Sequence, residues 1–174
     1  MADLVAACDR AAASPADRDR PGTVVGVAFD DLDTPAAIAS YEAALNAAPG
    51  ERRVNFQLGR ASARAGQFEQ ARDLYWRAAE QGSAVAMNNL GVLHKTGQGV
   101  TQDYAEARAW YERAAAGGDI DAMSNLGSLY ENGRGVARSV ARARSWYEKA
   151  AAAGHAEAQE ALDRLRPQSI HRWR

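Results

Sequence analysis

An all-α, right-handed helix-turn-helix solenoid is the fold class that this sequence predicts, on three observations. The triplet Asn89-Leu90-Gly91 recurs as Asn125-Leu126-Gly127, and residues 84–119 and 120–155 agree at 19 of 36 positions. Alanine, the strongest helix former, supplies 40 of the 174 residues. Apolar residues within each unit recur at helical 3/4 spacing. A fixed period in this range is typical of stacked repeats, in which no unit buries its apolar face alone.

The unit at 120–155 predicts two helices joined by a glycine turn. The first helix is expected over 120–132, and Gly133 and Gly135 should end it because glycine tolerates left-handed backbone. The second should begin near Ser139, a suitable N-cap, and close at Gly154. The residues expected on the buried stripes are Ala122, Met123, Leu126, Leu129 and Tyr130 in the first helix, and Ala143, Trp146, Tyr147, Ala150 and Ala151 in the second.

The unit at 84–119 repeats this plan with a stronger helix start. Asp103 and Glu106 have the three-residue separation of a capping box. Gly91 and Gly127 fall in the middle of predicted helices, where glycine costs about 1 kcal/mol against alanine. Their recurrence at one phase predicts that the second helix of each unit crosses the first too closely for a side chain.

The remaining segments divide around these two units. Residues 51–83 read as a shorter, tetratricopeptide-like unit that lacks four residues in the turn, and 36–50 as a half-repeat helix with Ala37, Tyr41 and Ala44 on its buried face. Residues 156–166 read as a closing helix and 167–174 as a tail. Residues 1–35 carry seven acidic and three basic residues and lie outside the repeat. They suit either an N-terminal cap on the first helix pair or an acidic arm that occupies the protein's own groove.

The repeated wording resembles a known family. The stretch from Ala122 to Val136 (AMSNLGSLYENGRGV), followed by Ala143 to Ala151 (ARSWYEKAA), is similar to a Sel1-like repeat, a relative of the tetratricopeptide repeat. The N-terminal wording from Cys8 to Asp30 resembles segments that precede Sel1 arrays in alphaproteobacterial proteins. The resemblance implies an adaptor in signalling, secretion or envelope processes, or an array appended to a peptidase. A cysteine-rich branch linked to β-lactam or peptidoglycan binding is a poor match, since Cys8 is the single cysteine.

Features that resemble catalytic or ligand sites are better explained by packing. The turns Gly97-x-Gly99 and Gly133-x-Gly135 follow helices and lack the GK[ST] of a phosphate loop. His94 stands where the next unit has Tyr130, which predicts a packed, hydrogen-bonded histidine. Cys8 has no histidine near it in the sequence. No His-x-x-x-His or Cys-x-x-Cys spacing is present, so we expect neither metal nor cofactor, and no enzyme activity.

A binding groove is the expected functional surface, because the first helices of such units line the concave face where peptides dock. Counting from each Leu-Gly pair, its exposed positions are predicted to be Arg53, Phe56, Arg60, Arg64, Asn88, Val92, Lys95, Ser124, Ser128 and Glu131, followed by Glu157 and Glu160. Residues 52–77 hold six arginines against two acids, so the groove should be basic at its N-terminal end and acidic at its C-terminal end. Asn89 and Asn125 are expected to bond backbone in a neighbouring unit.

The function predicted from these features is a non-catalytic protein-interaction scaffold that binds a peptide or helix carrying acidic groups. The alternative is a regulatory or substrate-presenting domain of a larger bacterial enzyme such as a peptidase. A net charge of −1 gives no reason to expect nucleic-acid binding. No apolar run approaches the length that spans a bilayer. The sequence as printed suggests the cytoplasm, or the periplasm if a signal peptide precedes it, and self-association through the array ends is open.

Overall fold

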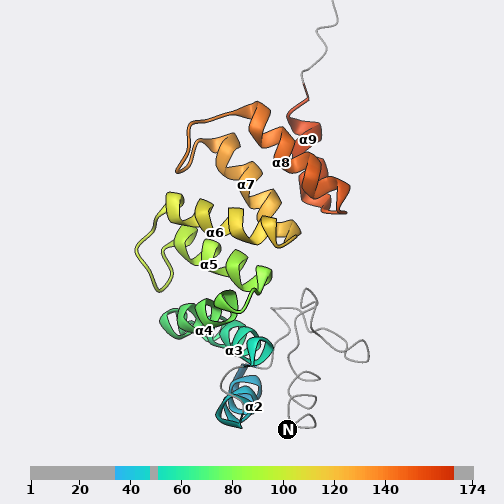
Figure 1. Cartoon of the computed structure of the whole chain (residues 1–174). Coiled ribbons are helices and arrows are strands. Elements are labelled where there is room, and N and C mark those ends of the chain that lie inside the picture. The colour runs from blue at the N-terminus through green and yellow to red at the C-terminus, as the bar shows by residue number, and fades with distance from the viewer. Residues whose placement is uncertain (1–33, 48–50, 167–174) are drawn as a thin grey trace, which may run out of the picture.

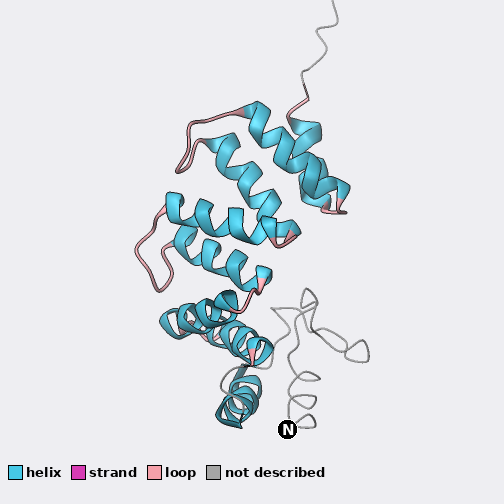
Figure 2. Cartoon of the chain, viewed as in Figure 1, coloured by secondary structure: helices cyan, strands magenta, loops and turns pink. Residues whose placement is uncertain are grey.

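The computed structural model describes residues 34–47 and 51–166, which form eight α-helices and confirm the all-α prediction (Figures 1 and 2). The helices are α2 (Thr34–Ala47), α3 (Arg52–Arg64), α4 (Phe68–Glu80), α5 (Ala84–Thr96), α6 (Tyr104–Ala116), α7 (Ile120–Asn132), α8 (Val140–Ala152) and α9 (Ala156–Arg164). Each packs mainly on the helix before and the helix after it, so the array runs from α2 at one end to α9 at the other (Figure 1). Within these residues, no helix combines the length and apolar character needed to cross a bilayer.

The helix ends follow the predicted capping chemistry. Ser139 accepts a hydrogen bond from the Arg142 amide at the start of α8. Gly97 and Gly133 end α5 and α7 with φ of 75° and 67°, in the left-handed region. The turn between α3 and α4 has three residues, whereas the turns after α5 and α7 have seven, as the shorter first unit predicted. α9 ends at Arg164, so the closing helix is two residues shorter than expected.

Close helix crossing explains the glycines in the middle of α3, α5 and α7. A Cβ atom at Gly91 would lie 2.5 Å from the Tyr111 ring, and one at Gly127 would lie 2.6 Å from the Tyr147 ring. At Gly59 the nearest ring atoms of the equivalent tyrosine would be 2.8 Å away. Each tyrosine ring therefore lies flat against the backbone of its partner helix, and the predicted reason for these glycines is confirmed.

The second glycine of each long turn joins one unit to the unit before it. Gly99 has a φ of 66°, and a Cβ there would lie 2.6 Å from the carbonyl carbon of Phe68 at the start of α4. Gly135 makes the same close approach to Tyr104 at the start of α6, at 2.5 Å. The Arg72 guanidinium also donates to the Gly99 carbonyl at 3.1 Å. The two long turns thus act as contacts between units as well as connections within them.

Four overlapping apolar clusters form the core along the array. α2 covers the outer side of the first helix pair: Ala37, Tyr41 and Ala44 are buried as predicted, against Leu58 and Leu74. Trp110 and Trp146 were expected on fully buried faces, but both are only partly buried. Their indole rings lie at the surface edge of the core, where Arg113 and Lys149 lie over them at 4.8 and 4.2 Å.

The Asp103 cap gives a pH-dependent prediction. Its carboxylate accepts hydrogen bonds from the amides of Ala105 at 2.7 Å and Glu106 at 3.1 Å, and these bonds hold the pKa of Asp103 below its ordinary 3.8. Because the folded-state pKa is lowered, the cap stabilises the protein above the unfolded value and is lost as the pH falls through the folded value. An Asp103→Asn variant keeps a capping side chain that does not titrate.

We therefore expect the melting temperature of the wild type, relative to that of Asp103→Asn, to be constant at neutral pH and to fall below pH 3.8. Thermal unfolding followed by circular dichroism at a series of pH values measures this difference. All other acids are common to both proteins and cancel. A difference that does not change with pH would show that this carboxylate does not cap α6.

Candidate partner-binding groove

The groove predicted from the sequence follows α3, α5 and α7, the first helices of the three units. Along α5 and α7, its residues are accessible as predicted at several positions: Ser128 is exposed, and Val92, Lys95 and Ser124 are partly buried. On α3, Arg64 is exposed and Arg53 is partly buried. The central part of the array therefore presents a polar surface with one apolar side chain, Val92.

Three of the predicted positions are buried, so their expected exposure was wrong. Phe56 is 2% exposed and packs in the core with its ring centroid 6.1 Å from that of Tyr75. Arg60 is 4% exposed and donates to Gln57 Oε1 at 3.1 Å. Asn88 is 6% exposed and accepts from Asn125. Counting from Leu-Gly placed these residues on the right side of each helix but could not show how deeply that side is covered.

A chain of side-chain hydrogen bonds crosses the groove between α5 and α7. Lys95 Nζ donates to Asn125 Oδ1 at 3.2 Å, and Asn125 Nδ2 donates to Asn88 Oδ1 at 3.1 Å. Burial, and secondarily the charge of Arg134, lowers the pKa of Lys95. The expectation that Asn125 bonds backbone was wrong, because its printed partners are side chains of the preceding unit. Asn89 likewise meets a side chain there, the hydroxyl of Tyr75.

Glu131, predicted as an acidic groove residue, holds the last unit together. Its Oε2 accepts from the Tyr147 hydroxyl at 2.8 Å, and both of its carboxylate oxygens lie 3.0 Å from Arg164 Nη2. Burial, together with this carboxylate, raises the pKa of Tyr147. Because Arg164 compensates the charge of Glu131, the acidic end of the groove depends on Glu157 and Glu160, which are exposed on α9.

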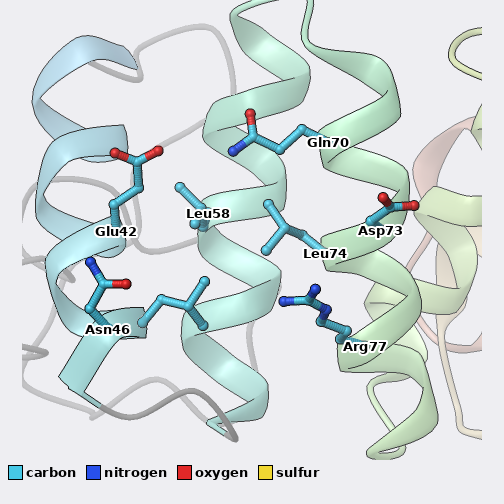
Figure 3. A pocket seen from close by; sticks show the side chains of 8 residues that line it. Glu42, Asn46, Leu58, Gln70, Asp73, Leu74 and Arg77 are labelled. Carbon is cyan, nitrogen blue, oxygen red and sulfur yellow. The ribbon is translucent and has the colours of Figure 1, made fainter.

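A cavity of about 510 Å³ lies away from this groove, between α2 and α4 (Figure 3). Glu42, Asp73 and Arg77 stand on its rim, and Leu58 and Leu74 lie at its floor between the two helices. The floor leucines are only 1% and 4% exposed, so they offer almost no apolar surface to a ligand. The cavity is a shallow polar depression and not a built ligand site.

Two side chains qualify the predictions about chemistry. His94 is partly buried as predicted, but its Nδ1 is buried without a hydrogen bond, so the expected hydrogen-bonded histidine was wrong in that respect. Trp76, which the sequence analysis did not single out, is 51% exposed on α4. The available signal was its position, since the later units carry Glu112 and Glu148 there. Across 34–47 and 51–166, no three His, Cys, Asp or Glu side chains gather as metal ligands would, and Cys8 lies outside the described residues.

Stacked helix pairs whose tyrosines lie on mid-helix glycines, with glycine turns that touch the preceding unit, define this protein as an α-solenoid of the tetratricopeptide-related class. The family model for the Sel1 repeat matches residues 56–83, 84–119 and 120–155. The chain belongs to the Sel1 repeat family. Sel1 repeats generally mediate protein interactions and are typically non-catalytic.

Solved structures support this assignment. A Sel1 repeat protein from Oxalobacter formigenes is similar at 34% identity and a TM-score of 0.68, covering 77% of this chain and 56% of the other. The Escherichia coli protective antigen c5321 is similar at 26% identity and a TM-score of 0.56, covering 74% and 36%. The Helicobacter pylori cysteine rich protein B is similar at 25% identity and the same TM-score, covering 79% and 98%. The chain thus spans just over half of the Oxalobacter protein, and a search of curated proteins finds no match.

Proposed function

We propose that this protein is a non-catalytic scaffold that binds a peptide or helix of another protein along the groove of α3, α5 and α7. The observation that carries the proposal is the set of accessible groove residues in matching positions of successive units: Val92 and Ser128 directly follow the mid-helix glycines of α5 and α7. A repeating surface of this kind suits an extended ligand, which meets equivalent positions one unit after another.

The polar chain across the groove supports the proposal. Asn125 is held by Lys95 on one side and Asn88 on the other, so its amide is already oriented before a partner arrives. A pre-organised amide loses less conformational entropy when it bonds a ligand backbone. Arg53, Arg64 and Lys95 would meet acidic groups of the ligand, and Ser124 and Ser128 would bond its polar groups. Phe56, Arg60, Asn88 and Glu131 would act mainly by positioning these helices.

The proposal is tested by reversing two accessible groove charges, Arg64→Glu and Lys95→Glu, in one variant. Glutamate already stands at the position of Lys95 in the next unit, as Glu131, so the change suits the fold. A matched control reverses one arginine and one lysine on the opposite helices, Arg77→Glu and Lys149→Glu. Each variant serves as bait for lysate proteins, and a captured protein is then purified and titrated against all three chains.

We expect the groove variant to bind the captured protein at least about tenfold more weakly than the wild type, since each lost charge contact contributes on the order of 1 kcal/mol. The control variant should bind like the wild type. Equal weakening by both variants would indicate a general charge effect, and a partner that binds the groove variant normally would contradict the assigned surface.

A further inference from the structure

The groove side of α3 is more deeply covered than the same side of α5 and α7. Nine consecutive residues of α3, Val54–Ser62, are buried. Since an α-helix turns by about 100° per residue, nine residues point to every side of the helix. Arg60 follows the mid-helix glycine of α3 and is buried, whereas Val92 and Ser128 at the same position are partly buried and exposed. The first unit thus lacks the open groove surface of the other two.

Neighbouring helices do not account for this difference. Among the described helices, α3 packs mainly on α2 and α4, just as α5 packs on α4 and α6. α2 covers the outer side of the first pair through Tyr41, Leu58 and Leu74, so the end of the array is already capped. An N-terminal segment acting only as an end cap would duplicate α2. The additional covering on α3 falls on its groove side.

The covered side of α3 is polar and basic. Asn55, Gln57 and Ser62 have no exposed surface, and Arg60 is 4% exposed. Arg53 and Arg64 lie near the two ends of the same helix. A guanidinium that leaves water is stable only where hydrogen-bond acceptors and negative charge compensate its own charge. The occupant of this side is therefore expected to be acidic.

The chain itself supplies such an occupant. Asp30, Asp31 and Asp33 come directly before α2, which begins at Thr34 and packs on α3. Four residues span at most about 14 Å, so this cluster is tethered close to α3. Residues 1–33 hold seven acids against three arginines, opposite the excess of arginines at 52–77.

We propose that residues 1–33 lie along the groove side of α3, with the carboxylates of Asp30, Asp31 and Asp33 facing Arg53, Arg60 and Arg64. The segment then occupies the basic end of the groove as an intramolecular ligand. A partner from another protein would meet the open surface of α5 and α7, and it would reach α3 only by displacing the segment. The proposal extends the proposed function, but it concerns one chain alone.

The test is amide hydrogen exchange on the full chain, read by mass spectrometry. One variant neutralises the cluster (Asp30→Asn, Asp31→Asn and Asp33→Asn), and asparagine at 33 keeps a side chain that can cap α2. A matched variant makes the same charge change elsewhere in the segment (Asp9→Asn, Asp17→Asn and Asp19→Asn). We expect amides of α3 to exchange about tenfold faster in the first variant only, with α7 and α8 unchanged.

A second measurement restores the charge pairing in the opposite sense. Arg64→Glu alone should speed exchange in α3, and Arg64→Glu combined with Asp31→Arg should slow it again. Unchanged exchange in the cluster variant, an equal effect of both neutralised variants, or faster exchange in every helix would overturn the proposal. No partner is present in these measurements, so they can fail while the proposed groove function stands.

Discussion

Replacing Gly127 by leucine is expected to lower the free energy of unfolding by about 3 kcal/mol, because the new side chain must enter space filled by the Tyr147 ring. A Cβ at this position would already lie 2.6 Å from the ring. Leucine favours a helix over glycine by nearly 1 kcal/mol, so the clash must outweigh a gain in propensity. For a protein of this size the loss corresponds to a fall in melting temperature of roughly 6–12 °C.

The adjacent substitution Ser128→Leu is the matched control, since it adds the same side chain to α7 at an exposed position. It should change the melting temperature little. A double variant, Gly127→Leu with Tyr147→Ala, locates the clash. We expect its destabilisation to be smaller than the sum of the two single effects, because the alanine removes the ring that opposes the leucine. Additive effects would mean that the ring does not require this glycine.

The Arg60→Glu variant is expected to lose about 3–5 kcal/mol of stability, because it reverses a charge that is buried on α3. Arg60 is 4% exposed and donates to Gln57 Oε1. A carboxylate there cannot donate to that oxygen, and two acceptors would face each other. Reversal of this arginine would therefore confuse loss of folding with loss of binding, which is why the groove test above uses Arg64 and Lys95.

Arg64→Glu provides the comparison on the same helix. Arg64 is exposed in the last turn of α3, where reversal opposes the helix dipole and costs at most about 1 kcal/mol. Urea unfolding of the wild type and the two variants by circular dichroism gives both values. If the two variants lose the same stability, the position of Arg60 in the fold does not matter, and the burial argument for α3 fails.

Sequence reasoning was sufficient for features that depend on neighbours along the chain. Asp103 and Ser139 cap their helices, and Gly97 and Gly133 end theirs, because capping and left-handed backbone are decided within a few residues. The mid-helix glycines were also interpreted correctly, since their recurrence at one phase in successive units left packing as the common cause. Periodicity showed which side of each helix faces the core in most cases.

The tertiary structure alone decided how far each groove residue is covered and what it bonds. Glu131 appeared to be a groove acid, but α9 brings Arg164 to it from 33 residues away and Tyr147 reaches it from α8. Asn125 bonds Lys95 and Asn88 of the preceding unit, at separations of 30 and 37 residues. Repeat phase places equivalent residues on equivalent sides, but Arg60, Val92 and Ser128 share one phase and differ in burial.

The sequence by itself therefore determined the helices, their order, their caps and the family, because these depend on short-range backbone preferences and on a repeat that is visible in the letters. The tertiary structure decided the accessible surface of the groove, the polar chain from Lys95 to Asn88 and the bonds of Glu131. These depend on side chains from separate helices meeting in space, and local patterns do not specify which side chains meet or how completely they exclude water.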